Sequence, residues 1–370
     1  MVSRLESLHG CLLGGGMGDA LGLPYERLSP QKIQKMLPAS SAGALGANAS
    51  SESAPVRGGL DLSLLPSRGL FSDDTEHALL TARALLESRG DPQTFGRYLR
   101  GELRPWFFTL PPGIGLATLK ASLKAAIFLP NTGVHSAGNG PAMRAPILGA
   151  FFHNSTRQLR EFCDVSTHLT HLDPRAKWGA FAVALAASEA ANGRCDARRF
   201  VRELCEWSDD SDAARETISL AKSAANSASR GQSTAQFCAE MGLENGVSGY
   251  ILHTVPVVLQ CWLRHDQNFR AALEEIVLCG GDTDTTAAIL GGIIGARVGA
   301  SRLPLDWEYG LVDFPNTRGY IQRVAQEMES AEKDALAVVA PRVLIGAPLL
   351  RNAVFVGILL VHVVKRAVTR

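Results

Sequence analysis

A strongly apolar run that directly follows a cluster of acidic residues constrains the fold of this chain most. Residues 287–294 contain no charged side chain, and residues 280–285 just before them read GGDTDT. A run this apolar belongs in a protein interior, where unpaired carboxylates at its start would be costly. Gly291, Gly295 and Gly299 recur every four residues, which suits close packing of one helix on another. The pattern predicts a central helix whose first turn faces a positively charged group.

The rest of the chain also has helical patterning. In residues 74–88, for example, the apolar residues recur at a spacing that places them on one helix face. Asp91-Pro92 and Asp173-Pro174 are typical helix starts. No alternating run or series of hairpin turns predicts a sheet. The sequence therefore predicts a compact all-α protein, with helices near 74–88, 94–107, 114–128, 141–152, 156–168, 174–192, 197–207, 213–228, 247–264, 266–279, 283–299 and 316–338.

Composition limits the class of protein and of partner. Hydrophobic residues make up 46% of the 370 residues and charged residues 20%, which is typical of a globular chain. Lys and Arg number 37 against 36 Asp and Glu, so no extended nucleic-acid partner is expected. The seven cysteines are odd in number and include no Cys-x-x-Cys pair, which favours reduced thiols in a cytoplasmic protein. Arg4, Glu6 and His9 interrupt any apolar leader, so no signal peptide is expected.

The predicted helical domain spans residues 1–338. Two segments of the chain differ in composition from its helices, one inside the domain and one after it. Residues 38–68 are rich in Ser, Ala, Gly and Pro and are predicted to form a long flexible loop that could cover a site. Residues 339–370 are predicted to hold an apolar C-terminal helix of unknown role. Its apolar stretch, 353–364, is too short to cross a membrane. A buried helix is favoured over a dimer contact or a membrane-surface helix.

A second acidic cluster provides a partner for the first. Residues 71–75 read FSDDT and also precede a helical pattern. Carboxylate and hydroxyl oxygens without a nearby His or Cys favour Mg²⁺ or Mn²⁺ over zinc or copper. Either cluster alone could simply cap a helix, and for the second cluster alone that interpretation is favoured. Together they favour a metal site with six candidate ligands: Ser72, Asp73, Asp74, Asp282, Asp284 and Thr285.

Three further segments carry candidate binding or catalytic groups. Residues 14–22 are dense in glycine and precede Glu26, a candidate acid or base; tight helix packing is the alternative for these glycines. Gly138-Asn139-Gly140 precedes a proline, as in a helix start that binds phosphate, although an ordinary turn has the same pattern. His171 could line a pocket or lie satisfied in the core.

In this order, the segments resemble the ADP-ribosylglycohydrolase family. The matching pieces cover roughly residues 8–300: GDALG at 18–22 with Glu26, SDDT at 72–75, GNG at 138–140 with Met143-Arg144, Thr170-His171, and 280–296. The last motif is very specific, and the joint order is hard to reach by chance. Ser72 stands where many members have Thr, which keeps the hydroxyl, and Thr286 stands where Asn is common.

The resemblance implies a metal-dependent hydrolase that cleaves the glycosidic bond between the distal ribose of ADP-ribose and a modified protein side chain. It implies a dinuclear Mg²⁺ or Mn²⁺ centre held by the six candidate ligands. It further implies Glu26, Asp73 and Asp284 as catalytic carboxylates, and a substrate pocket formed by Gly138, Asn139, Gly140, Met143 and His171.

Two other functions stay open at this point. A protein of this kind could bind ADP-ribose without turnover, or it could hydrolyse another ADP-ribosyl compound. The sequence predicts ADP-ribose or an ADP-ribosylated protein as partner and no transmembrane span. It leaves open the linkage, the choice between Mg²⁺ and Mn²⁺, the oligomeric state and whether residues 38–68 gate the site.

Overall fold

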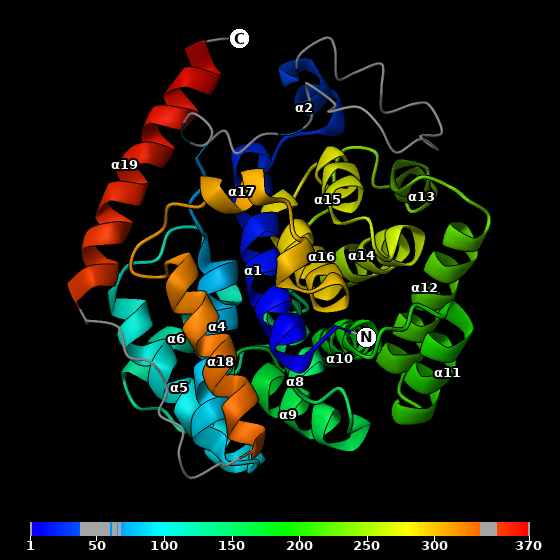
Figure 1. Ribbon diagram of the computed structural model, residues 1–370, viewed down its shortest axis with the longest axis horizontal. Coiled ribbons are helices and arrows are strands. Elements are labelled where there is room, and N and C mark those ends of the chain that lie inside the picture. Colours follow the sequence, from blue (N-terminus) through cyan, green and yellow to red (C-terminus); the bar gives the residue numbers. More distant parts are fainter. Residues whose placement is uncertain (1, 38–59, 61–64, 66–67, 334–345, 369–370) are drawn as a thin grey trace.

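The computed structural model describes residues 2–37, 60, 65, 68–333 and 346–368 (Figure 1). Within these residues the chain is helical, with isolated β-bridges and no sheet. The α-helices are α1 (Arg4–Gly22), α2 (Pro30–Met36), α4 (Asp73–Ser88), α5 (Pro92–Phe108), α6 (Leu116–Ala126), α7 (Gly140–Met143), α8 (Ala145–Phe151), α9 (Thr156–His168), α10 (Pro174–Ala191), α11 (Ala197–Trp207), α12 (Asp212–Ser229), α13 (Thr234–Glu240), α14 (Ile251–His265), α15 (Phe269–Leu278), α16 (Thr283–Val298), α17 (Leu305–Gly310), α18 (Arg318–Lys333) and α19 (Gly346–Val368). Short 3₁₀ helices cover Leu23–Tyr25 and Ala300–Arg302.

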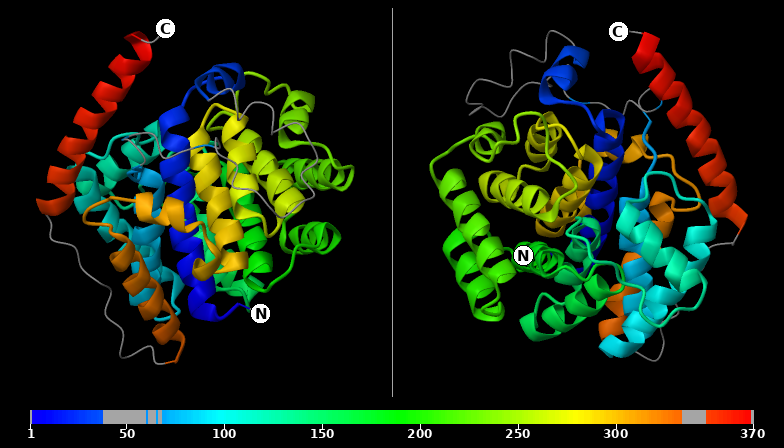
Figure 2. Two further views of the ribbon diagram at one scale, coloured as in Figure 1. Left: turned by 45° about the horizontal axis from the view of Figure 1, so that its top comes forward. Right: turned by 180° about the vertical axis from the view of Figure 1, so that it is seen from behind.

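Helices α1 and α16 lie side by side at the centre of the molecule (Figures 1 and 2). Their glycines bring the two backbones into direct contact. A Cβ at Gly18 would lie 2.0 Å from the Ala287 carbonyl oxygen, and one at Gly295 would lie 2.0 Å from the Gly10 carbonyl oxygen. Only hydrogen fits at such positions. The predicted central helix and its close packing are therefore confirmed, and the dense glycines of α1 serve that packing.

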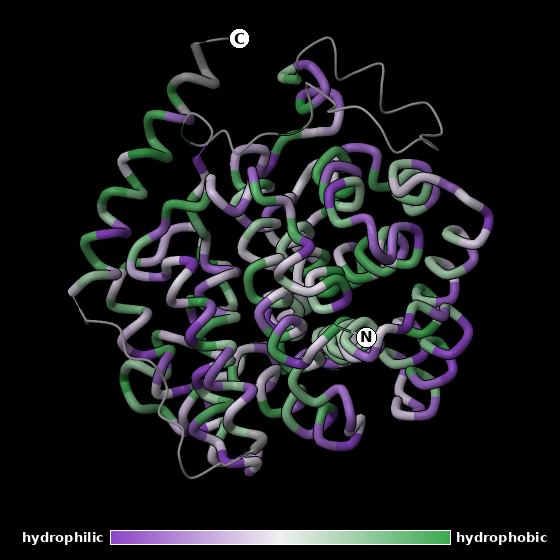
Figure 3. The backbone as a smooth tube through the Cα atoms, viewed as in Figure 1, coloured by the Kyte–Doolittle hydropathy of each residue, from purple (hydrophilic) through white to green (hydrophobic). Residues whose placement is uncertain are grey.

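The surrounding helices bury this pair on most sides. Helices α4, α8, α10, α14 and α15 all pack against α16, and α10 is buried over nearly its whole length. Figure 3 shows hydrophobic residues along the central helices and also along the outlying helix α19. The apolar run of α16 is buried from Ala287 to Ala296, as its sequence predicts. The N-terminus of α16 is thus fixed inside a rigid core.

Most predicted helices are confirmed to within a few residues, but one predicted helix is divided, and four observed helices were not predicted: α1, α2, α13 and α17. The helix expected over 141–152 is split at Arg144 into α7 and α8. Pro146 lacks an N–H group and cannot continue the hydrogen-bond ladder back to Ala142. Helix α1 was not among the predicted helices, because its many glycines are poor helix formers in isolation.

The predicted loop over residues 38–68 lies almost entirely outside the described residues, and so do residues 334–345. The division of the chain at residue 338 therefore stays a prediction. Among the described cysteines all seven thiols are free, and Cys205 is exposed.

The C-terminal helix α19 is only partly buried, so the expectation of a buried helix is wrong. Leu350, Leu360 and Val361 are each more than half exposed, whereas Arg351, Asn352 and Phe355 are buried. Phe355 packs with Leu23 and Leu70 in a small separate cluster. The helix thus rests on the domain through one face, and it lies at the edge of the molecule (Figure 2). No described helix is long and apolar enough to cross a membrane.

Candidate functional site

The two acidic clusters, more than 200 residues apart in the sequence, meet at the N-termini of α4 and α16. The Ser72 hydroxyl donates to Asp74 Oδ2 at 3.1 Å, and the Thr285 hydroxyl donates to the same oxygen at 3.1 Å. Ser72 is also the N-cap of α4, so the capping interpretation is correct for that residue. Both helices direct the positive ends of their dipoles toward these carboxylates. The structure thus brings the two predicted ligand segments into direct contact through Asp74.

The carboxylates at this point are buried without enough positive charge to balance them. Burial raises the pKa of Asp73, Asp74 and Asp284 well above the usual range. Repulsion from neighbouring carboxylates raises it further, chiefly from Asp19 for the first two and from Glu26 for Asp284. Asp74 Oδ1 is buried and has no hydrogen-bond partner. Such a cluster is stable in its charged form only when a cation joins it.

A hard divalent cation fits this set of donors. Carboxylate and hydroxyl oxygens are the ligands that Mg²⁺ and Mn²⁺ prefer. The orphaned oxygen of Asp74 provides an open ligand position. Within the described residues, no three His, Cys, Asp or Glu side chains stand at metal-ligand spacing around one point. The fit therefore rests on the donor chemistry, the burial and the unsatisfied oxygen, and not on a closed coordination shell.

Asp19 holds the acidic segment at the start of α4 in place through hydrogen bonds. This fully buried carboxylate accepts hydrogen bonds from the backbone N–H groups of Ser72, at 2.9 Å, and Thr75, at 3.1 Å, and from the Thr75 hydroxyl. Burial raises the pKa of Asp19 to about 6, although the bonds from Thr75 and Ser72 lower it. Asp19 lies on α1, so the central helix pair fixes both acidic segments.

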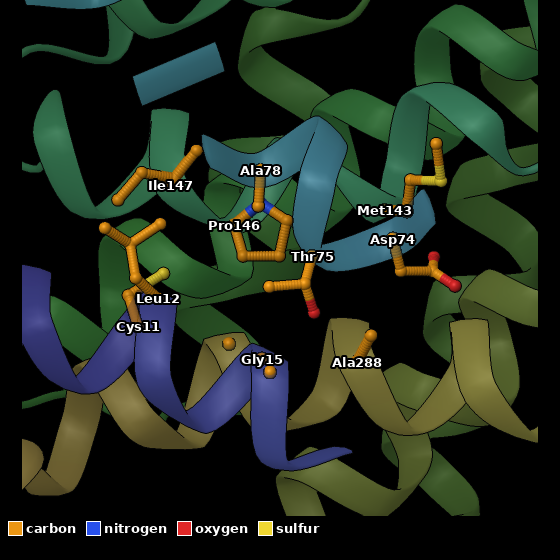
Figure 4. A pocket seen from close by; sticks show the side chains of 12 residues that line it. Cys11, Leu12, Gly15, Asp74, Thr75, Ala78, Met143, Pro146, Ile147 and Ala288 are labelled. Atoms are coloured by element: carbon orange, nitrogen blue, oxygen red, sulfur yellow. The ribbon is translucent and has the colours of Figure 1, made fainter. Parts of the chain in front are cut away.

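Behind the cluster lies a small cavity of about 20 Å³. Figure 4 shows Asp74 and Thr75 on α4 facing α1 and α16, with Met143 beside Asp74. The remaining lining is mostly apolar and includes Gly15, Pro146 and Ala288. This cavity has about the size of one water molecule and is too small for an organic ligand.

A larger cavity of about 530 Å³ opens in front of the cluster. Its volume lies within the range of small-molecule sites. Every predicted substrate-binding and catalytic residue lines it, and so do four of the six candidate ligands: Glu26, Asp73, Gly138, Asn139, Gly140, Met143, His171, Asp282, Asp284 and Thr285. Ser72 and Asp74 are not among its lining residues. The structure therefore unites the predicted pocket and most of the predicted ligands around one cavity.

Asn139 links the glycine segment to the acidic cluster. Its Nδ2 donates to Asp282 Oδ2 at 2.7 Å and to the Thr254 hydroxyl at 3.0 Å. Its backbone N–H donates to the Gly249 carbonyl at 2.9 Å. Gly138 and Gly140 flank this anchor at the start of α7. The Gly138-Asn139-Gly140 segment, called the glycine cradle below, is thus held at a fixed distance from Asp282.

The sequence reasoning missed Gly113 and residues 115–118, which also line the cavity, and a further wall formed by residues 246–249. This segment pairs with the GGDTDT turn: Asp282 N donates to the Val247 carbonyl at 2.7 Å, and a Cβ at Gly281 would lie 2.0 Å from that carbonyl. Gly281 also has a φ of +85°, which favours glycine. The GVSG sequence before α14 was the available signal, but two glycines around a short polar stretch are common in ordinary turns.

Burial of the ring and a nearby buried cation keep His171 neutral. Arg144 is fully buried, and its Nη2 donates to the Thr170 hydroxyl at 2.7 Å. Because a guanidinium only donates, Thr170 Oγ1 accepts that bond. We assign the hydroxyl hydrogen of Thr170 to His171 Nδ1, 2.9 Å away, because no other described acceptor meets this buried hydroxyl. Burial, followed by the charge of Arg144, lowers the pKa of His171 to about 3. His171 is therefore neutral at ordinary pH, with its proton on Nε2.

The Nε2 edge of His171 faces the glycine segment. A Cβ at Gly138 would lie 3.1 Å from His171 Nε2, and one at Gly140 would lie 3.0 Å from Cε1 of the same ring. His171 thus presents a neutral N–H donor beside Gly138 and Gly140 at the cavity wall. Of the two interpretations offered for His171, the structure supports the one that lines a pocket.

Glu26 also lines the cavity and lies directly after the Leu23–Tyr25 helix. Its side chain is 30% exposed and forms an ion pair with Arg27 at 3.2 Å. Arg27 has a φ of +61°, and its N–H donates to the Gly281 carbonyl at 2.7 Å. This bond ties the Glu26 segment to the GGDTDT turn. A carboxylate that reaches both solvent and the acidic cluster can exchange protons between them.

Comparison with known proteins agrees with this arrangement. The sequence profile of the ADP-ribosylglycohydrolase family matches residues 1–336. An uncharacterised protein of Archaeoglobus fulgidus is 28% identical over 87% of this chain and 96% of its own length. The protein YegU of Escherichia coli, also uncharacterised, is 30% identical over 81% of this chain and 90% of its own. The ADP-ribosylhydrolase ARH3 of Homo sapiens is 24% identical over 85% of this chain and 91% of its own.

A solved structure also shares the fold. It is named as an ADP-ribosylglycohydrolase-related protein complex and superimposes with a TM-score of 0.60 at 22% identity, covering 89% of this chain and 99% of its own. The match of the family profile over most of the chain is the decisive finding, since the structural likeness alone shows only the fold. The chain therefore belongs to the ADP-ribosylglycohydrolase family of hydrolases.

Proposed function

We propose that the protein hydrolyses the glycosidic bond between the distal ribose of ADP-ribose and a modified protein side chain. One observation carries the proposal: two buried acidic helix ends and a glycine cradle share a single cavity of about 530 Å³. The acidic ends suit a cation, and Gly138 and Gly140, which allow a ligand to approach the backbone closely beside the His171 N–H, suit a phosphate. A ligand with phosphates at one end and a reacting sugar at the other matches both.

The residues have distinct roles in this proposal. Ser72, Asp73, Asp74, Asp282, Asp284 and Thr285 would hold two Mg²⁺ or Mn²⁺ ions. Bound ions of this kind lower the pKa of a water and fix the position of sugar hydroxyls. Asp73 and Asp284, which line the cavity, would orient the sugar and neutralise charge that develops at its C1″.

Glu26 would transfer the proton. Water adds its oxygen to C1″, the bond from C1″ to the side-chain atom breaks, and the leaving atom takes the electron pair. The proton released by the water passes through Glu26 to that leaving atom. The partly exposed position of Glu26 beside the acidic cluster supports this role, because it keeps the carboxyl in exchange with solvent.

The activity is tested with a panel of defined ADP-ribosyl linkages. Purified protein is incubated with arginine-, serine- and glutamate-linked ADP-ribosylated proteins, and with small ADP-ribosyl compounds, in the presence of Mg²⁺ or Mn²⁺. We expect release of free ADP-ribose from at least one protein linkage. Release only from small compounds would favour the alternative substrate class. Tight ADP-ribose binding in calorimetry without any turnover would favour a binding protein.

The neutral tautomer of His171 gives a separate prediction about ligand binding. Replacing Thr170 by Val removes the hydroxyl that receives from Arg144 and donates to His171 Nδ1. The ring is then free to carry its proton on either nitrogen, so the Nε2–H donor toward the ligand is no longer fixed. Loss of one oriented donor lowers the affinity for a ligand roughly tenfold. We expect the Kd for ADP-ribose to rise about tenfold while Mn²⁺ affinity is unchanged, as calorimetry can measure.

Thr81→Val is the matched control for this change. Thr81 is equally buried, and its hydroxyl donates to the His77 carbonyl of its own helix, away from the cradle. It should lower stability without moving the Kd for ADP-ribose. An unchanged Kd in Thr170→Val, or an equal change in Thr81→Val, would contradict the role given to His171.

A further inference from the structure

The C-terminal helix α19 lies outside the part of the chain that matches the family, which ends at residue 336. It nevertheless inserts polar side chains into the domain. Arg351 is 7% exposed and Asn352 is 1% exposed, although the neighbouring Leu349 and Leu350 are exposed. Burying an arginine is costly unless its donors are satisfied by specific partners. The partners of Arg351 therefore indicate what the helix does.

Those partners surround Phe71, the residue directly before the α4 metal-ligand segment. Arg351 Nη2 donates to the Phe71 carbonyl and to Asp313 Oδ2, and its Nε donates to the same Asp313 oxygen at 3.2 Å. Asp313 Oδ2 in turn accepts the Phe71 N–H at 3.0 Å. The Arg351–Asp313 pair thus binds both polar groups of the Phe71 main chain. The backbone is fixed immediately before Ser72.

The same arginine also faces the first turn of α4. Its Nη1 lies 3.7 Å from Oε1 of Glu76, whose other carboxylate oxygen accepts from Trp106 Nε1 at 2.6 Å. Glu76 is buried two residues after Asp74. Without Arg351 the charges of Glu76 and Asp313 would stand close behind the acidic cluster and add to its repulsion.

Asp19 and Arg351 consequently hold the segment from two sides. Asp19 binds the N–H groups of Ser72 and Thr75 from α1, and Arg351 binds the Phe71 carbonyl from α19. We propose that Arg351 is a positioning residue for the metal centre, so that α19, an element outside the family match, helps to set the affinity of the site for its divalent ion. This inference rests on the metal-dependent hydrolase proposed above.

The test measures Mn²⁺ binding directly, so that it does not depend on knowing the substrate. Full-length Arg351→Met keeps the length of the side chain but removes its charge and all its donors. We expect its Kd for Mn²⁺, from calorimetry or the free-Mn²⁺ signal in electron paramagnetic resonance, to rise between about 10- and 100-fold, the usual effect of losing an outer-shell partner. The kcat for any measured substrate should recover as Mn²⁺ is raised to saturation.

Asn352→Ala is the matched control within α19. Asn352 Nδ2 donates to the Thr109 carbonyl at 2.9 Å and to the Thr109 hydroxyl at 3.1 Å, so its loss loosens the helix but leaves the bonds to Phe71. It should lower the unfolding temperature while its Kd for Mn²⁺ stays within about threefold of wild type. An equal loss of Mn²⁺ affinity in Asn352→Ala would assign the effect to general loosening and overturn the proposal.

Arg351→Lys covers the case in which Arg351→Met fails to fold, as judged by circular dichroism. A lysine keeps the charge but not the planar fork that reaches Asp313 and Phe71 together. We expect a folded protein with a Kd for Mn²⁺ raised several-fold. Wild-type Kd values in the folded Arg351 variants would overturn the positioning role alone. Failure of the wild-type protein to bind Mn²⁺ at all would instead overturn the metal centre on which the inference rests.

Discussion

Replacing Asp284 by Ala is expected to abolish Mn²⁺ binding and to reduce turnover by more than about a hundredfold. Loss of a residue that only supports a metal ligand already costs about 10- to 100-fold in metal affinity or activity, and Asp284 is proposed as a ligand itself. In EDTA the same variant should unfold at an unchanged or higher temperature. Asp284 is 7% exposed, and its charge is opposed by burial and by Glu26, Asp282 and Asp74. Removing it relieves that repulsion in the metal-free protein. Calorimetry and thermal unfolding measure the two effects.

Asp306→Ala is the control for the loss of one carboxylate. Asp306 lies on the surface with a side chain that is 63% exposed, and its ion pair with Arg270 is of a kind that contributes little. It should leave both metal binding and turnover unchanged. Full activity in Asp284→Ala would show that the ligand assignment is wrong.

Replacing Gly295 by Ala is expected to destabilise the fold by about 3 kcal/mol or more, at the upper end of the usual cost of overpacking. The new methyl carbon would lie 2.0 Å from the Gly10 carbonyl oxygen and 2.8 Å from its carbon. The obstacle is backbone and not a flexible side chain, so α1 and α16 would have to move apart. Because Asp19 and Asp284 lie on these two helices, Mn²⁺ affinity should fall as well. Urea unfolding gives the change in free energy.

Gly101→Ala makes the same chemical change, but we expect it to have the opposite effect on stability. Gly101 lies in α5 and is exposed, and a Cβ there would meet no atom within 4 Å. Alanine at such a site stabilises by about 0.5–1 kcal/mol, because it restricts the unfolded chain. Equal effects at the two glycines would contradict the backbone contact between α1 and α16.

Much of this structure could be predicted because a helix is indicated by residues that lie close together in the sequence. The spacing of apolar residues predicted α4, α10 and α16, and the acidic residues at the starts of α4 and α16 indicated that these two helix ends belong together. The spacing of Gly291 and Gly295 predicted that α16 packs closely on another helix. In each case the pattern that carries the prediction is contained within a short stretch of the sequence.

Other features depend on contacts that no local pattern reveals. The glycines of α1 disfavour a helix by themselves, and only the backbone of α16 beside them makes that helix stable. The apolar stretch of α19 suggested a buried helix, whereas Arg351 and Asn352, which resemble ordinary surface residues in the sequence, are the ones that insert. Likewise the wall at residues 246–249 is set by the pairing of Val247 with Gly281, 34 residues away.

The most direct test compares the rate of ADP-ribose release before and after removal of divalent ions. Protein stripped with EDTA is assayed on the mono-ADP-ribosylated protein that gives the highest rate, without added metal and then with Mg²⁺ or Mn²⁺ restored. The paired acidic helix ends predict a rate that falls to background in EDTA and returns with one of the two ions, in wild type but not in Asp284→Ala. A rate that survives complete removal of divalent ions would contradict the central role of the site.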